Sequence, residues 1–139
     1  LQDGNTLCFA SRRGGGFGGS DIYCSKQDES GNWTNPINQG PNINTSTEEF
    51  HFTQDKDGMV YFTSNRPGGY GGMDIYGAMQ LGPNSWGAAR NLGPQVNTAA
   101  ADMCPALPPG DNTFSWFSTR QDNSLGGIDI FWTNKLNTQ

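Results

Sequence analysis

The sequence predicts an all-β protein built from repeated antiparallel hairpins, and three observations support this class. One signature of paired strands occurs three times. Short runs of β-branched and aromatic residues stand between clusters of Gly, Pro, Asn and Asp, and runs of good helix formers are missing. Gly accounts for 20 of the 139 residues, as a turn-rich chain requires. The three copies contain Phe9-x-Ser11-x-Arg13 with Asp21-Ile22-Tyr23, Phe62-x-Ser64-x-Arg66 with Asp74-Ile75-Tyr76, and Phe117-x-Thr119-x-Gln121 with Asp129-Ile130-Phe131.

The copies recur at a nearly constant spacing. Asp21 and Asp74 are 53 residues apart, and Asp74 and Asp129 are 55 residues apart. A period of this size is typical of repeat proteins, in which each unit buries its hydrophobic face against the next. We therefore expect one region, 1–139, with repeats over about 1–45, 46–98 and 99–139.

Each repeat is expected to hold four short strands, and the second repeat shows them most completely. Residues 50–53 form the first strand, 59–64 the second after an Asp-Gly turn, and 74–79 the third after a Gly-rich loop. The segments around Trp33 and Trp86 form the fourth strand or lead into it. Four antiparallel strands at this period make a β-propeller blade, whose innermost strand lines a central channel. The expected innermost strands are 50–53 and 103–107.

Alternation along the two middle strands predicts the core. In each repeat, the Phe of the first middle strand is expected on one face of the sheet. The Ile of the second middle strand, or an aromatic residue next to it, is expected on the strand that faces this Phe. The expected core residues are Phe9, Phe62, Phe117, Ile22, Ile75 and Ile130.

The second repeat resembles the WD40-like, TolB-type β-propeller repeat of bacterial envelope proteins. The resemblance covers nearly the whole chain and implies a propeller that acts mostly as a binding scaffold, often beside OmpA-like domains. The third repeat departs from the pattern, because Gln121 stands where the others have Arg13 and Arg66. The residues that carry the resemblance are Asp57-Gly58, Tyr61-Phe62-Thr63-Ser64-Asn65-Arg66-Pro67-Gly68-Gly69-Tyr70-Gly71-Gly72, Asp74-Ile75-Tyr76, Asn91-Leu92-Gly93-Pro94 and Asn97-Thr98.

The repeated Asp and Arg residues are interpreted as structural. Asp21, Asp74 and Asp129 open a strand, where a carboxylate accepts backbone N–H bonds from its own loop and pairs with Arg13 or Arg66. The alternative is a ring of carboxylates for Ca²⁺ or for hydrolysis. Identical recurrence in every repeat favours bracing, and no calcium-binding ladder of Asp residues is present.

The paired glycines of the three hairpins, Gly18-Gly19, Gly71-Gly72 and Gly126-Gly127, are expected to supply a positive φ in a wide loop. Phosphate binding by these loops would need a helix N-terminus behind them, which the sequence does not predict. We expect no cofactor and no metal site.

Candidate ligand-binding residues lie where the repeats differ or where aromatics cap loops. His51 is the single histidine and lies on an expected innermost strand, close to Glu48 and Glu49. The third repeat has Cys104 at this position, beside Asp102. A His beside carboxylates either acts as a base or ligand, or is a satisfied strand residue. Phe17 and Tyr70 stand at loop tips, where they either contact a partner or fold back over the hairpin. Trp86 is the remaining candidate, for stacking on a sugar.

The cysteines predict one possible bridge. If Phe9 pairs with Tyr23, Cys8 faces Cys24 across the hairpin, which permits a disulfide and implies an oxidising compartment. The alternative is a pair of buried thiols at packing positions. Cys104 is then left over.

Charge and length limit the partners. The formal net charge is −5 with only eight Lys and Arg, spread along the chain, which argues against nucleic acid. No apolar run is long enough to cross a membrane. The opening Leu1-Gln2-Asp3-Gly4 reads as the middle of a repeat, so mature or excised sequence is expected. The low Lys content suits a bacterial protein that is periplasmic, associated with the outer membrane or secreted.

The leading hypothesis for function is a non-catalytic binding scaffold of the bacterial cell envelope, with a protein, peptide or glycan partner. The alternatives are a carbohydrate-active hydrolase or lyase, using Glu49, His51 and Asp102, and a lectin. About two and a half to three repeats fall short of the four to eight blades of a closed propeller. The chain is therefore expected to belong to a longer protein or to form a homo-oligomer that completes the ring.

Overall fold

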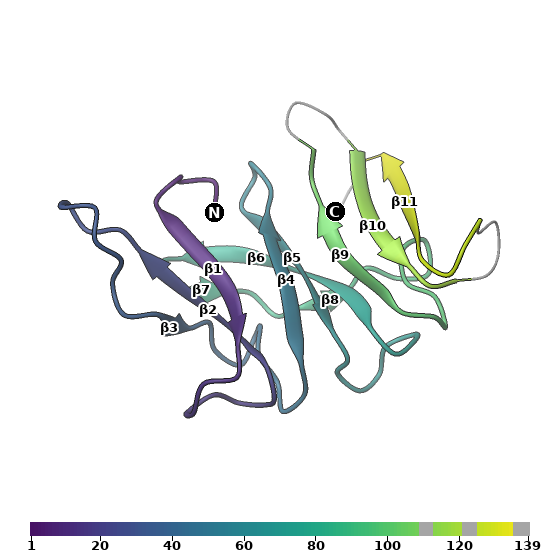
Figure 1. Ribbon diagram of the computed structural model, residues 1–139, viewed down its shortest axis with the longest axis horizontal. Coiled ribbons are helices and arrows are strands. Elements are labelled where there is room, and N and C mark those ends of the chain that lie inside the picture. The colour runs from purple at the N-terminus through teal and green to yellow at the C-terminus, as the bar shows by residue number, and fades with distance from the viewer. Residues whose placement is uncertain (109–112, 121–124, 135–139) are drawn as a thin grey trace.

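A computed structural model describes residues 1–108, 113–120 and 125–134, and it is all-β over these residues (Figure 1). No helix able to span a membrane occurs in that part of the chain. The strands are β1 (Thr6–Ser11), β2 (Asp21–Lys26), β3 (Ile37–Asn38), β4 (Glu49–Gln54), β5 (Met59–Ser64), β6 (Asp74–Gly82), β7 (Ser85–Trp86), β8 (Arg90–Asn91), β9 (Asp102–Ala106), β10 (Thr113–Ser118) and β11 (Asp129–Asn134).

The strands form three antiparallel sheets that lie side by side in chain order (Figure 1). The first has the order β1-β2-β3, the second β4-β5-β6-β7 with β8 also on β6, and the third β9-β10-β11. None of these sheets closes on itself within the described residues. The predicted all-β class is confirmed.

The middle sheet has five strands instead of the expected four. Strands β4, β5 and β6 correspond to the first three expected strands. Strand β6 is longer than the expected 74–79, because it turns back at Asn84 and pairs with β7, so that Gln80 lies opposite Trp86. Trp86 therefore belongs to this short hairpin, and the outer strand is β8, which pairs Asn91 with Tyr76. Trp33 forms an isolated bridge with Gln27 and likewise precedes the outer strand of its sheet, β3.

The core lies between neighbouring sheets. One cluster joins the first and second sheets, and a second cluster joins the second and third. Each hairpin thus buries one face against its neighbour, and burial of this apolar surface is the main stabilising term. The first cluster contains Ile22, Cys24, Ile43, Val60, Phe62, Tyr76, Ala78 and Trp86, and the second contains Tyr61, Ile75, Val96, Phe114 and Trp116.

The third hairpin is shifted by one residue from the expected alignment. Ser118 pairs with Asp129 as Ser64 pairs with Asp74, so Trp116 is the counterpart of Phe62. The predicted core position Phe117 is wrong, because it points to the opposite face of the strand and is 40% exposed.

Ile130 was also expected in the core, and it is 65% exposed. Its counterparts Ile22 and Ile75 are completely buried, because each has another sheet packed over it. Among the described residues no sheet covers the outer face of β11.

Two connectors, residues 40–49 and 93–102, join the sheets through equivalent asparagines. The Asn44 side chain accepts a hydrogen bond from Ile22 N (2.7 Å) and donates one to Ile22 O (2.9 Å). Asn97 makes the same two bonds to Ile75, both at 2.8 Å. Both asparagines are almost completely buried. Each connector therefore satisfies the backbone of the preceding hairpin at the point where the next sheet begins.

None of the paired glycines has the expected positive φ, and in the first two pairs the first glycine serves close approach of a backbone. The left-handed positions in the loops are Gly15 and Gly68. A Cβ on Gly71 would overlap the carbonyl oxygens of Thr98 and Ala100 in the connector. A Cβ on Gly18 would likewise overlap the first connector, so these two glycines let a backbone pass directly over the loop.

Gly71→Ala is expected to lower the free energy of unfolding by about 1–3 kcal/mol, because the new methyl group overlaps connector backbone that cannot move alone. Gly72→Ala is the matched control, since a Cβ at Gly72 meets nothing within 4 Å. Urea denaturation of the two variants checks this. Equal stability of the two variants would contradict it.

Cys8 and Cys24 form a disulfide between β1 and β2, at the positions that the register places opposite each other. The bridge closes a loop over a sequence separation of 16. Cys104 has a free thiol that is partly buried, and burial raises the pKa of this thiol.

Without a reductant, alkylation of the unfolded protein is expected to modify Cys104 alone, and all three cysteines after reduction. In the native protein at pH 8, Cys104 is expected to react more slowly than in the unfolded chain, because its raised pKa leaves less thiolate. Peptide mass spectrometry after timed alkylation checks both points. Modification of Cys8 or Cys24 without a reductant would exclude the disulfide.

Candidate functional site

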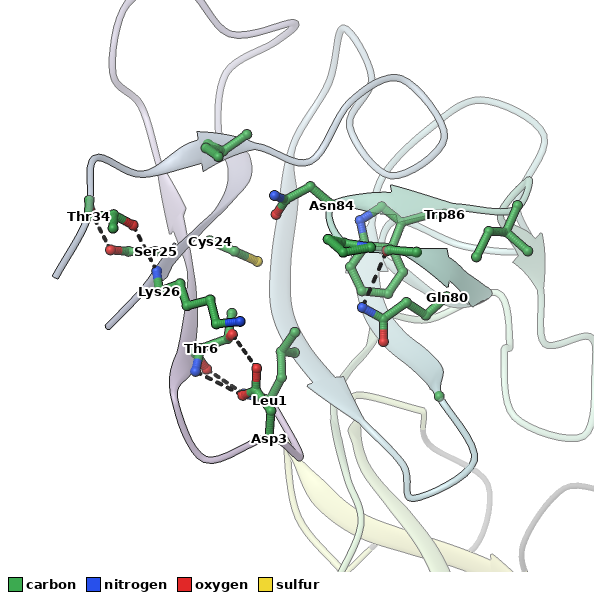
Figure 2. A pocket seen from close by; sticks show the side chains of 15 residues that line it. Leu1, Asp3, Thr6, Cys24, Ser25, Lys26, Thr34, Gln80, Asn84 and Trp86 are labelled. Atoms are coloured by element: carbon green, nitrogen blue, oxygen red, sulfur yellow. Dashed lines mark hydrogen bonds between the residues drawn. The ribbon is translucent and has the colours of Figure 1, made fainter. Parts of the chain in front are cut away.

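A groove of about 470 Å³ lies between the first sheet and the β6–β7 hairpin of the second (Figure 2). It is the candidate binding site because it is concave and carries both polar and apolar groups. Figure 2 shows Asp3, Thr6, Ser25 and Lys26 on one side, with Gln80 and Trp86 on the other. The full lining is Leu1, Asp3, Thr6, Cys24, Ser25, Lys26, Thr34, Ile37, Gly58, Gln80, Leu81, Gly82, Pro83, Asn84 and Trp86.

The first-sheet wall has one carboxylate and one ammonium group. Asp3 accepts bonds from Thr6 Oγ1 (2.6 Å) and from the backbone N–H groups of Asn5 and Thr6 (3.0 and 2.9 Å). The Thr6 hydroxyl is the main cause that lowers the pKa of Asp3, and the backbone bonds act in the same direction. The Lys26 side chain extends across the same wall (Figure 2). This wall therefore presents both signs of charge to a ligand.

The opposite wall is held rigidly. Trp86 Nε1 donates to Gln39 Oε1 (2.9 Å), and Gln39 Nε2 donates to Asn84 Oδ1 (3.2 Å). Phe52 packs edge-on against the indole with 5.4 Å between ring centroids. Because Trp86 is only 4% exposed, its ring face is not available for stacking on a sugar. Trp86 shapes the groove, and Gln80 and Asn84 supply its amide groups.

Glu49 and Asp102 are not on a ligand-accessible surface, which corrects their place among the candidate ligand residues. Both are completely buried. Glu49 accepts bonds from Thr45 N (2.8 Å), Thr45 Oγ1 (2.7 Å) and Ser64 Oγ (2.7 Å). Asp102 accepts equivalent bonds from Thr98 N (2.6 Å) and Thr98 Oγ1 (2.8 Å). These carboxylates brace the start of β4 and β9.

The arginines do not pair with the loop aspartates as expected. The Arg66 guanidinium lies over the rings of Tyr76 and Phe62, 4.6 and 5.2 Å from their centroids, and 3.5 Å from Glu49. Burial lowers the pKa of Arg66, and the Glu49 carboxylate opposes this effect. Arg13 stacks on Phe9 and Tyr23 in the same way.

Arg120 takes this position in the third hairpin, 3.4 Å from the Phe131 centroid and 5.5 Å from that of Trp116. The prediction that Gln121 takes the place of Arg13 and Arg66 in the third hairpin is therefore wrong. The third repeat was aligned one residue too far along the chain, and Arg120 is the true counterpart. Gln121 itself lies outside the described residues.

The loop aspartates hold the hairpin loops. Asp21 accepts bonds from Phe17 N and Gly18 N, and Asp74 accepts them from Tyr70 N and Gly71 N. Asp129 accepts bonds from Leu125 N (2.9 Å) and Gly126 N (3.2 Å). Phe17 and Tyr70 at the loop tips are each 50% exposed. Neither side chain lines the groove.

His51 and Cys104 occupy equivalent bulged positions on β4 and β9. Both have positive φ, 53° and 54°. His51 Nδ1 and Cys104 N each lie 3.2 Å from Thr63 Oγ1, which the second hairpin supplies. Partial burial of the imidazole lowers the pKa of His51. Within the described residues no group of three or more His, Cys, Asp or Glu could hold a metal ion.

Sequence reasoning missed the two side chains that hold the sheets together, Asn44 and Asn97, and the groove residues Lys26, Gln80 and Asn84. The Ile/Val-Asn-Thr pattern in both connectors was a usable signal for the asparagines. No repeated pattern marks the groove, because its two walls come from different hairpins.

Comparison of the chain with models of protein families and with curated proteins gives no match. The resemblance to the TolB-type repeat therefore stays a prediction.

Glu49→Ala is expected to lower the free energy of unfolding by about 3–5 kcal/mol, because it leaves the largely buried Arg66 without its carboxylate. Glu48→Ala is the matched control. Glu48 pairs with Arg12 on the surface (3.3 Å), where such a pair contributes at most about 1 kcal/mol. Chemical denaturation at pH 7 measures both. A Glu49→Ala loss no larger than that of Glu48→Ala would contradict a bracing role.

Proposed function

We propose that the protein is a non-catalytic β-propeller binding module of the bacterial cell envelope, which holds a glycan, peptide or protein partner in the groove beside Trp86. The observation that carries this proposal is the groove itself. Its walls come from two sheets, and it combines one ammonium, one carboxylate and two amide side chains with apolar side chains.

The propeller architecture is supported by the repeated geometry of the hairpins. Strands β1–β2, β5–β6 and β10–β11 each pair a Ser with the loop Asp at one end, and each carries an Arg over two aromatic rings. Sheets that pack face to face in chain order, through equivalent connectors, are what successive blades would need. Further blades, supplied from outside the described residues, would complete the ring.

A non-catalytic role is supported by the state of the candidate acids. Glu49 and Asp102 have no exposed surface and make equivalent bonds to threonines of the connectors. A general acid or base must reach its substrate. The alternative, a carbohydrate-active enzyme, gains less support for this reason, whereas a lectin stays compatible with the amide-lined groove.

An envelope or extracellular location is supported by the Cys8–Cys24 bridge. Disulfides persist in oxidising compartments, which include the bacterial periplasm. The periplasm, the outer-membrane surface and the medium all meet this condition.

The test is a screen of the purified protein on glycan and decapeptide arrays, followed by calorimetric titration of the strongest binder. Lys26→Ala and Gln80→Ala are each expected to weaken binding about tenfold, the effect of losing one polar contact of about 1.4 kcal/mol. Arg12→Ala is the control, because Arg12 lies outside the groove. Failure of both arrays, or unchanged affinity in both groove variants, would overturn the proposal.

A further inference from the structure

The outer face of the third hairpin is an apolar surface that nothing in the described chain covers. Phe117, Ile128, Ile130 and Trp132 are 40%, 61%, 65% and 69% exposed. Phe117 pairs with Ile130 in the register, so these two side chains lie on one face. Ile22 and Ile75, the counterparts of Ile130, are completely buried. An apolar face of this kind marks an interaction site.

A second, independent observation comes from the loop. Gly126 is the counterpart of Gly18 and Gly71, each three residues before its loop aspartate. In the first two hairpins a side chain at this position would overlap a connector, whereas a Cβ on Gly126 meets nothing within 4 Å. Gly126 also has no positive φ. The absence of a side chain at this position is explained by a backbone that passes over the loop, as in the other two hairpins.

The occupied hairpins define what fits this face. The connector asparagine bonds both backbone groups of the isoleucine. The preceding residue, Ile43 or Val96, is buried in the core. The strand that follows begins by donating to the hairpin, from Glu49 N to Ser20 O (2.7 Å) and from Asp102 N to Met73 O (2.8 Å). Ile128 is the counterpart of Met73, one residue before the loop aspartate.

The connectors of a second folded copy cannot supply this segment. Ile43 and Val96 are completely buried, and Asn44 and Asn97 are each 1% exposed, because both connectors already occupy their own hairpins. The occupant must bring a connector that is free.

We propose that the third hairpin is an acceptor site for a free connector of the same repeat type, carried by a partner polypeptide. The segment consists of an aliphatic residue, Asn and Thr, followed by an innermost strand. The Asn side chain bonds the backbone of Ile130, the aliphatic residue covers Ile130 and Trp132, and the backbone passes over Gly126. This site is separate from the groove, so its failure would leave the proposed function standing.

The test uses the full chain and a synthetic peptide with the sequence of residues 40–54, which contains a connector and an innermost strand. The control peptide replaces the connector Asn by Ala. The expected result is movement of the backbone NMR signals of Ile130 and Trp132, with at least tenfold weaker binding of the control peptide. Equal binding of the two peptides, binding that leaves Ile130 unmoved, or no binding at millimolar peptide would overturn the proposal.

Two protein variants sharpen the test. Gly126→Ala is expected to keep the melting temperature of the protein and to weaken peptide binding at least tenfold, because the methyl group meets only the incoming backbone. Gly72→Ala is the matched control, with open space in the occupied second hairpin, and is expected to bind the peptide as the parent does. Unchanged peptide affinity in Gly126→Ala would also overturn the proposal.

Discussion

The structure depends on one repeated interaction, in which a connector asparagine bonds the backbone of an isoleucine in the preceding hairpin. Asn44 and Asn97 are both almost completely buried and bond both the N–H and the C=O of Ile22 and Ile75. Each of the two carbonyls also accepts a backbone bond, from Gln39 N or Leu92 N, so the larger effect is on the N–H groups. A buried N–H group without a partner would cost about 1–3 kcal/mol, so each asparagine stabilises the start of β2 or β6. The same bonds place the next sheet over the isoleucine, and the two core clusters form there.

The remaining polar groups extend this arrangement. Glu49 and Asp102 accept bonds from the threonine that follows each asparagine. On the hairpin side, Glu49 pairs with Arg66 and Asp102 accepts a bond from Trp116 Nε1. Since these groups are satisfied within the fold, chemistry directed at a partner falls to surfaces that the repeat does not use. The groove between the first two sheets and the uncovered face of the third hairpin are two such surfaces.

Much of the fold was predictable from alternation and turn residues. Strand β5 has the expected bounds, and the pairing of Phe9 with Tyr23 places Cys8 opposite Cys24. The third hairpin was misaligned because Phe117-x-Thr119 and Trp116-x-Ser118 both fit an aromatic followed by a hydroxyl residue, and its loop is one residue longer. The groove was not predictable, because Lys26 and Gln80 meet only through the packing of two sheets. The burial of Glu49 was hidden for the same reason, since its partners come from the connector (Thr45) and from the end of β5 and just beyond it (Ser64 and Arg66).

Native-state hydrogen exchange of three equivalent amides tests the central interaction most directly. The amides of Ile22 and Ile75 bond asparagine side chains, while no connector reaches Ile130 in the described part of the chain. We expect Ile22 and Ile75 to exchange only in the large openings that separate the sheets, and Ile130 to exchange orders of magnitude faster. Exchange of all three amides at one rate, fast or slow, would show that the asparagine bonds do not hold the sheets together.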